Sequence, residues 1–413
     1  MRGRPTSTDR LGAIQSARAI AALIVVFVHA IDAARRLGGP GVGVFAAFPN
    51  LAVFGGSGVD LFFVISGFVM THTLVHGGAD HRSMHFFRRR ITRIVPLFLL
   101  VSLAFLVLNP YDDVFAWQSI FYSATVLPVF DLSGYHAPAL YVGWTLGFEF
   151  AFYTIVAAAS ARGGGRRAVP LLLGLTIIAG LAGLLYEPRW APLRLLANPL
   201  QFEFALGVAL WLAFDLGWLR GRGAVARLVG ATMLLLGCAF GIALPLTSHY
   251  ADAVAGSSGL ARTLDWGLPW ALILAGMLTA PIGATRLSGG LRRIGDASYS
   301  IYLVHPFAVA LAWRAASSAW LTGTFIFIGA AMVASVLLGM AVHHWLEQPL
   351  LRAFAARQNH RSGAAGRCAV AAGVAERPAS VPARSASTVR PAALTSAKPP
   401  SIAIVSGSPF SVR

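Results

Sequence analysis

The chain has 413 residues, of which 56% are hydrophobic and only 12% are charged, yet its formal net charge is +17. A soluble domain carries about 25% charged residues, so this composition excludes a soluble enzyme, a disordered regulator and a DNA-binding domain, which needs a charged, water-facing surface. Apolar length combined with excess positive charge is typical of a polytopic membrane protein whose basic residues lie mainly on one side of the bilayer.

Apolar stretches of about 20 residues, long enough to cross a bilayer, recur along the chain. The first is longer than the core of a signal peptide and lacks a convincing cleavage site, so we expect it to be retained. The apolar segment 114–130 is short and is interrupted by Pro128, which favours a re-entrant or interfacial piece. We predict an all-α fold of ten transmembrane helices, at residues 12–34, 51–75, 91–109, 140–160, 168–186, 195–216, 225–246, 264–284, 297–316 and 322–346.

The distribution of arginine predicts the orientation of these spans. With the N-terminus in the cytoplasm, the segments on that side hold 17 basic residues before the tail, and the segments on the other side hold 6. Both termini are therefore predicted to be cytoplasmic. We expect a short N-terminal segment at 1–11, a membrane domain at 12–351 and a basic tail at 352–413, which is rich in Ala, Ser, Pro and Arg. Such a composition cannot bury a core, so the tail is predicted to be disordered and to lie on the anionic inner leaflet.

The first two predicted spans carry ionisable residues, each of which costs about 2.5–3.5 kcal/mol at the centre of a membrane on insertion scales. Arg18 and His29 are eleven residues apart, close to three helical turns, so they share one face of a helix. Asp60 follows the glycine-rich start of the second span at a depth similar to that of His29. We expect Asp60 to orient the imidazole, with a helix-capping aspartate as the alternative.

The third and fourth spans add a basic cluster and a buried acid. Arg90 and Arg93 in RRRITR share a helix face, and arginine forks bind phosphate through two hydrogen bonds. Anchoring of the cytoplasmic side explains such a cluster equally well. The stretch WTLGFEFAFY contains Trp144, Glu149 and Tyr153, the last two on one helical stripe. No arginine is evident at the depth predicted for Glu149, which favours a functional carboxylate.

The last two spans complete the set of polar groups. Ser298, Tyr302 and His305 follow one face of the ninth span. Glu347 ends the tenth in HHWLEQP, where the adjacent histidines point apart, so no metal site is predicted. Depths estimated from the span edges divide the polar residues into two groups. The outer group is His29, Asp60, Glu149 and Glu203, and the inner group is Arg18, Arg90, Arg93, Tyr302, His305 and Glu347.

In order along the chain, these motifs resemble the membrane-bound acyltransferase 3 family of O-acyltransferases. The likeness covers about residues 10–352 and rests on Arg-x10-His, GVDLFFVISGF, Arg-x-x-Arg, WTLxxExxFY, SYSIYLVH and the closing Glu-x-Pro. The segments WTLGFEFAFY and GDASYSIYLVHPF are most similar to those of the exopolysaccharide-modifying acetyltransferases. Phe150 stands where many members have a second glutamate. Many members also carry an extracellular esterase-like domain, where this chain has only its short tail.

The resemblance implies transfer of an acyl group, usually acetyl, from cytoplasmic acyl-CoA to a sugar hydroxyl. A hydroxyl needs a general base at neutral pH, which histidine supplies best, and the phosphates of CoA need a basic site. We assign catalysis to His29, with Asp60 or Glu149 orienting it; a covalent acyl-His29 relay stays open as the competing mechanism. Donor binding is assigned to Arg18, Arg90, Arg93, Tyr302 and His305. Supporting roles are assigned to Trp144, Tyr153, Ser298 and Glu347.

We therefore predict an acetyl-CoA-dependent O-acyltransferase of the bacterial inner membrane, acting on a cell-surface or exported glycan or its lipid-linked precursor. Acyl-CoA is a co-substrate, and neither a bound cofactor nor a metal is expected. The expected partners are the glycan acceptor, the lipid bilayer and polysaccharide assembly proteins, and not nucleic acid. The alternative is a transporter or flippase of a glycan or lipid-linked intermediate, whose path intramembrane charges would also mark. The paired broken helices of many transporters are not evident in the sequence.

Overall fold

The structure is a computed structural model. It describes residues 7–37, 51–77, 83–108, 117–131, 134–162, 164–219, 250–279, 286–317 and 323–356, with a few single positions between 225 and 235. The chain divides into a unit of residues 1–357 and a C-terminal unit of residues 358–413. The second unit, which is most of the predicted tail, lies outside the described residues, as does nearly all of the predicted span at 225–246.

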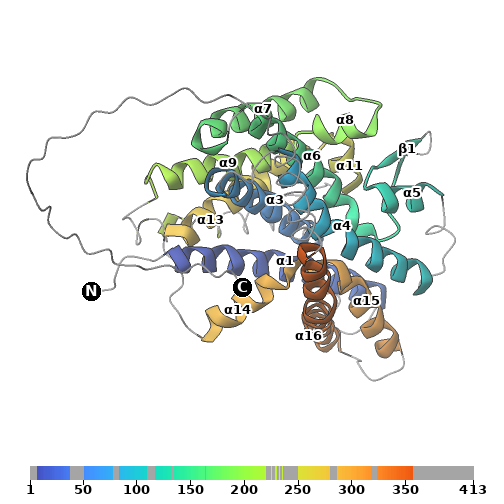
Figure 1. Ribbon diagram of the computed structural model, residues 1–413. Helices are drawn as coiled ribbons and strands as arrows, with labels where there is room; N and C mark the ends of the chain where they lie inside the picture. Colours follow the sequence, from blue (N-terminus) through green and yellow to red (C-terminus); the bar gives the residue numbers. More distant parts are fainter. Residues whose placement is uncertain are drawn as a thin grey trace, which may run out of the picture. The chain divides into compact units, whose positions relative to one another are not determined.

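The described part of the chain is built almost wholly from helices, as predicted (Figure 1). The longer helices are α1 (Ser7–Leu37), α3 (Leu51–His76), α4 (Ser83–Leu108), α6 (Trp144–Ala161), α7 (Ala168–Leu185), α9 (Gln201–Asp215), α13 (Leu268–Thr279), α15 (Ser298–Ser317) and α16 (Thr324–Val342). The shorter α-helices are α5 (Trp117–Thr125), α8 (Ala191–Leu196), α11 (Tyr250–Ala255), α12 (Gly259–Arg262) and α14 (Arg286–Asp296). Single turns of 3-10 or π-helix are η3 (Tyr141–Gly143), η4 (Gly165–Arg167), η5 (Thr263–Gly267) and η6 (His343–Glu347).

A small hairpin occupies part of the segment that the sequence marked as re-entrant or interfacial. The segment forms the short helix α5 and then the strand β1 (Val129–Asp131), with Pro128 between them. Strand β1 pairs antiparallel with β2 (Gly134–His136), and Phe130 lies opposite Tyr135. The segment is therefore not a helix that crosses the bilayer, in agreement with the prediction.

Six segments of the described chain are long and apolar enough to cross a membrane: Gly12–Arg36, Gly56–His76, Phe87–Leu108, Tyr141–Ala161, Gly165–Leu185 and Thr324–Ala356. This identifies a membrane protein. The predicted spans at 195–216 and 264–284 coincide with α9 and α13, which have 15 and 12 residues and are short for a full crossing at 1.5 Å per residue. The total of ten spans and the cytoplasmic position of both termini stay predictions.

Helix α1 packs against α3, α14, α15 and α16, so several other helices meet along it (Figure 1). Small residues make this possible, since close approach of membrane helices depends on them. A Cβ added at Gly58 of α3 would lie 2.6 Å from the carbonyl oxygen of Ala21, and one at Gly295 of α14 would lie 2.6 Å from the carbonyl carbon of Gln15. The polar side chains of α1 are thereby held where other helices can reach them.

Helices α3 and α9 approach each other most closely at a pair of glycines. A Cβ at Gly207 would lie 2.8 Å from the Cα of Gly67 and would overlap the carbonyl oxygen of Val64. Beside this crossing, the ring of Phe204 stacks between the rings of Phe63 and Phe152, with centroid distances of 4.7 and 4.5 Å. This contact orients α3, which carries Asp60 and part of the candidate site.

We predict that Gly207→Ala destabilises the protein, because the added methyl group meets backbone atoms that cannot rotate away. The expected cost is about 2 kcal/mol or more, measured as a lower melting temperature of the detergent-solubilised protein. Gly174→Ala on α7 is the matched control, because a Cβ there meets nothing within 4 Å. A Gly207→Ala protein that melts with the control would contradict the packing described here.

Candidate active site

Helices α1, α3, α4, α6 and α15 surround a cavity that holds most of the predicted donor site. The cavity encloses about 900 Å³ of empty space, counting its open mouth, which lies in the size range of small-molecule sites. Its apolar wall includes Phe62, Phe63, Val69 and Ile94. Its polar lining is Arg18, Ser66, Arg90, Arg93, Thr145, Glu149, Tyr153, Ser298, Tyr299 and Tyr302.

This grouping corrects the predicted division by depth. Glu149 was expected in the outer half without an arginine, whereas it shares the cavity with Arg18, Arg90 and Arg93. Residue number gives depth at 1.5 Å per residue only for helices that stand perpendicular to the membrane and begin at its edge. Instead, α6 begins at Trp144, after the turn η3, and α4 begins eight residues before the predicted span. Three guanidinium groups facing one carboxylate leave the wall with excess positive charge.

The predicted polar stripe on α6 is present. Thr145, Glu149 and Tyr153 all line the cavity, and the Tyr153 hydroxyl donates a hydrogen bond to Glu149 Oε2. Tyr302 of α15 contacts the beginning of this stripe. Its hydroxyl donates to the carbonyl oxygen of Val142 at 2.8 Å and lies 3.2 Å from Thr145 Oγ1. The carboxylate is thus held by a neighbour on its own helix, one turn further along.

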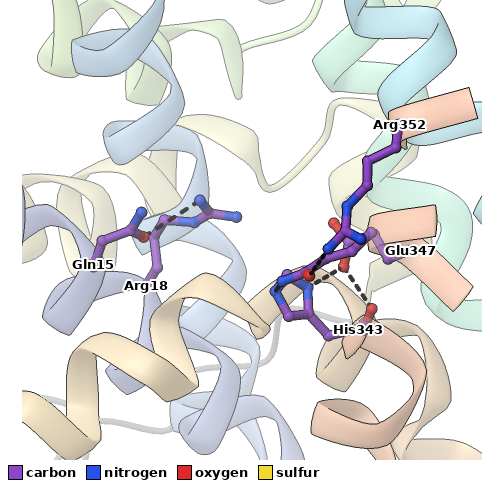
Figure 2. Close-up of polar contacts among 7 residues, drawn as sticks. Gln15, Arg18, His343, Glu347 and Arg352 are labelled. Carbon is purple, nitrogen blue, oxygen red and sulfur yellow. Dashed lines mark hydrogen bonds and ion pairs between the residues drawn. The ribbon is translucent and has the colours of Figure 1, made fainter. Parts of the chain in front are cut away.

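Figure 2 shows how two of the predicted residues are held outside this stripe. Arg18 NH1 donates to Gln15 Oε1 of the preceding turn, at 3.5 Å. Glu347 Oε2 accepts hydrogen bonds from Ser300 Oγ and from His343 Nδ1, both at 2.7 Å. Glu347 is buried and is not among the residues that line the cavity. Its contacts join α15 to the end of α16, which fits a supporting role.

His29 does not meet either of the carboxylates expected to orient it. Its Nδ1 atom lies 3.1 Å from Nε2 of His305 and 2.9 Å from the carbonyl oxygen of Val25. The ring of Tyr141 packs beside it, with centroids 5.3 Å apart. His305, expected among the inner, donor-binding residues, is therefore the direct neighbour of His29 and does not line the cavity.

Asp60 is engaged elsewhere, in a buried ion pair that the sequence did not reveal. Arg262 of α12 binds both of its carboxylate oxygens, at 3.1 Å from Nε and 2.6 Å from NH2, and also donates to the carbonyl oxygen of Gly56 at 3.2 Å. Asp60 is 0% exposed and Arg262 only 4%. A carboxylate removed from water needs an opposite charge more than a neutral imidazole, so the expected contact between Asp60 and His29 is wrong. Arg262 falls between the predicted spans at 225–246 and 264–284, and the one signal for it in the sequence is an arginine just before the apolar run of the eighth span.

Three further predicted residues occupy defined positions. Trp144 is buried at the start of α6, and its carbonyl oxygen accepts a hydrogen bond from Tyr122 at 3.3 Å. The hydroxyl of Ser298 is buried in the cavity lining and has no hydrogen-bond partner among the described residues. Glu203, which is fully buried on α9, does not line the cavity, and its carboxylate lies close to Asp60 and Arg262. The supporting roles assigned to Trp144 and Ser298 stay predictions.

We predict that Arg262→Gln lowers the stability of the protein strongly, because it leaves the charge of Asp60 buried without a partner. Breaking a buried ion pair costs about 3–5 kcal/mol, measurable as thermal melting in detergent. Arg36→Gln removes the exposed pair with Asp32 and should cost less than about 1 kcal/mol. If Asp60→Asn melts like the wild type but is inactive, Asp60 has a catalytic role and the structural reading fails.

Comparison with known proteins identifies the family. The family model of the acyltransferase domain matches residues 11–344. The exopolysaccharide production protein ExoZ of Rhizobium meliloti (strain 1021) is 32% identical over 326 residues, which cover 76% of this chain and 95% of ExoZ. The acyltransferase MdmB of Streptomyces mycarofaciens is 25% identical over 407 residues, covering 86% of this chain and 95% of MdmB. The "Putative peptidoglycan O-acetyltransferase YrhL" of Bacillus subtilis (strain 168) is 25% identical over 332 residues, covering 73% of this chain and 51% of that protein. No solved structure matches. The chain belongs to the acyltransferase 3 family, as its motifs indicated.

Proposed function

We propose that this protein is a membrane O-acyltransferase that moves an acyl group, with acetyl the expected one, from cytoplasmic acyl-CoA to a hydroxyl of a glycan or of its lipid-linked precursor. The observation that carries this proposal is the cavity, where Arg18, Arg90 and Arg93 face a single carboxylate beside an apolar wall. Family membership supports acyl transfer. The names of ExoZ and YrhL, which refer to exopolysaccharide and peptidoglycan, favour a glycan as acceptor.

The cavity suits a donor that is polyanionic at one end and apolar at the other. Arginine binds phosphate through two charge-assisted hydrogen bonds, and CoA carries several phosphates. Phe62, Phe63 and Val69 supply a surface against which the pantetheine arm and a short acyl group can pack. We propose the inner membrane as the location, with the cavity open to cytoplasmic acyl-CoA.

In the proposed reaction His29 is the general base. It takes the proton of the acceptor hydroxyl while the oxygen attacks the thioester carbonyl, and the tetrahedral intermediate carries negative charge that nearby donors stabilise. The carbon–sulfur bond then breaks, the acyl group stays on the sugar oxygen, and the CoA sulfur receives the proton from His29. Tyr302 is suited to link the donor cavity to the pair formed by His29 and His305, because it lines the cavity and lies beside His305 on α15. A relay through acyl-His29 is the competing order of steps.

We predict that His29→Ala reduces transfer of radiolabel from acetyl-CoA to the acceptor glycan by at least about 100-fold, since general base catalysis contributes on this order. The measurement uses purified membranes with equal amounts of each protein, verified by quantitative blotting. Full transfer in the variant would contradict the role of His29. Movement of glycan across the membrane without labelling, in the wild type, would instead favour the flippase.

We predict that Arg18→Gln raises the KM for acetyl-CoA about 10-fold with a smaller effect on kcat, because a hydrogen bond to a charged group contributes roughly this factor. The control is a short thioester without phosphates, S-acetyl-N-acetylcysteamine, with which the variant and the wild type should perform alike. An Arg18→Gln defect of the same size with both donors would remove the assignment of Arg18 to the CoA phosphates.

A further inference from the structure

The contact between His29 and His305 fixes which nitrogen of each ring carries a hydrogen. Nδ1 of His305 lies 2.8 Å from the carbonyl oxygen of Tyr302. A carbonyl oxygen can only accept a hydrogen bond, so Nδ1 of His305 must donate and must be protonated. A neutral imidazole has one N–H, so Nε2 of His305 presents a lone pair. That lone pair faces His29.

His29 is constrained in the same way. Its Nδ1 lies 2.9 Å from the carbonyl oxygen of Val25, so this nitrogen also carries a hydrogen. The same hydrogen is shared with Nε2 of His305, at 3.1 Å. Both contacts are consistent with one tautomer of His29, in which its Nδ1–H makes both hydrogen bonds. Its Nε2 keeps a lone pair that neither of these contacts uses.

We propose that His305 is a positioning residue that makes Nε2 of His29 the nitrogen that accepts the proton. This inference rests on the function proposed above. When His29 takes up a proton at Nε2, both of its nitrogens carry hydrogen, and Nε2 of His305 continues to accept from Nδ1–H. The positive charge is then stabilised by a neutral acceptor, in the place that a carboxylate occupies in a Ser-His-Asp triad.

Burial separates the roles of the two rings. His305 is 0% exposed, whereas His29 is partly exposed, so an acceptor hydroxyl can reach His29 but not His305. Neither histidine is among the residues that line the cavity, which argues against the donor-binding role expected for His305. A proton on Nε2 of His305 would set two N–H groups against each other, so only His29 can be the base of the pair.

The groups around the pair leave this arrangement intact. The ring of Tyr141 lies 5.3 Å from that of His29, and the ring of Tyr302 lies 6.1 Å from that of His305. Asp32, the acid nearest along α1, is held by Arg36 at 2.6 Å on the exposed end of the helix. The acceptor for Nδ1–H of His29 is therefore an imidazole and a backbone carbonyl, not a carboxylate.

Two matched variants of His305 test the proposal. Glutamine places its amide where Nε2 of histidine lies and can still accept from His29, whereas asparagine reaches only the position of Nδ1 and keeps only the contact with Tyr302. We expect His305→Asn to lower kcat about 10- to 100-fold while the KM for acetyl-CoA changes less than about twofold, and His305→Gln to retain about a third or more of the wild-type kcat. Equal kcat values for the two variants, or a kcat that falls only in step with the melting temperature, would overturn the proposal.

A second measurement does not depend on activity. Nitrogen-15 NMR of protein labelled at histidine distinguishes protonated from bare ring nitrogens, and the signals of His29 are those lost in His29→Gln. We expect Nδ1 of His29 to be protonated and Nε2 to be bare, and the reverse tautomer would overturn the assignment. If the wild-type protein transfers no acetyl group, the proposed function fails, and comparison of the His29 signals in His305→Asn with those of the wild type still decides whether His305 sets the tautomer; an unchanged tautomer in His305→Asn would overturn that part of the proposal.

Discussion

A polar side chain buried in an apolar protein costs free energy unless it finds a partner, and the ionisable residues of helix α1 show how this requirement is met. Arg18 forms a hydrogen bond with Gln15, and His29 has hydrogen-bond contacts with the carbonyl oxygen of Val25 and with His305. Around the same helix, α3 and α14 approach the backbone of α1 closely at Gly58 and Gly295, where a Cβ would meet backbone atoms. Small residues on its neighbours therefore allow close packing around the helix that carries Arg18 and His29.

The polar residues of the membrane domain gather in two regions that differ from the outer and inner groups expected from the sequence. One is the basic cavity with Arg18 and Glu149, and the other is the pair of histidines beside Tyr141. Tyr302 belongs to both, since its hydroxyl lies at the cavity and its carbonyl oxygen accepts from His305. In the proposed reaction, the donor bound in the cavity and the base His29 therefore lie on two sides of Tyr302.

Patterns within one helix were predictable from the sequence, whereas contacts between helices were not. The stripe through Glu149 and Tyr153 followed from a spacing of four residues, and of the residues assigned to donor binding Arg18, Arg90, Arg93 and Tyr302 line one cavity, whereas His305 does not. The partners of Asp60 and His29 lie 202 and 276 residues away in the chain, and no periodicity reports such a pairing. Depth failed for a related reason, because it depends on how each helix is tilted and where it begins.

The contrast between Asp60 and His29 follows from how charge behaves away from water. Asp60 is buried against Arg262, whose permanent opposite charge is the partner that stabilises a carboxylate removed from water. His29 changes its charge during the proposed reaction, and a buried carboxylate beside it would lack an opposite charge in every step in which the imidazole is neutral. His305 avoids this cost, because a neutral ring accepts the same hydrogen bond before and after proton transfer. The acid suggested by the sequence is thus better placed in the ion pair, and the neutral residue is better placed beside the base.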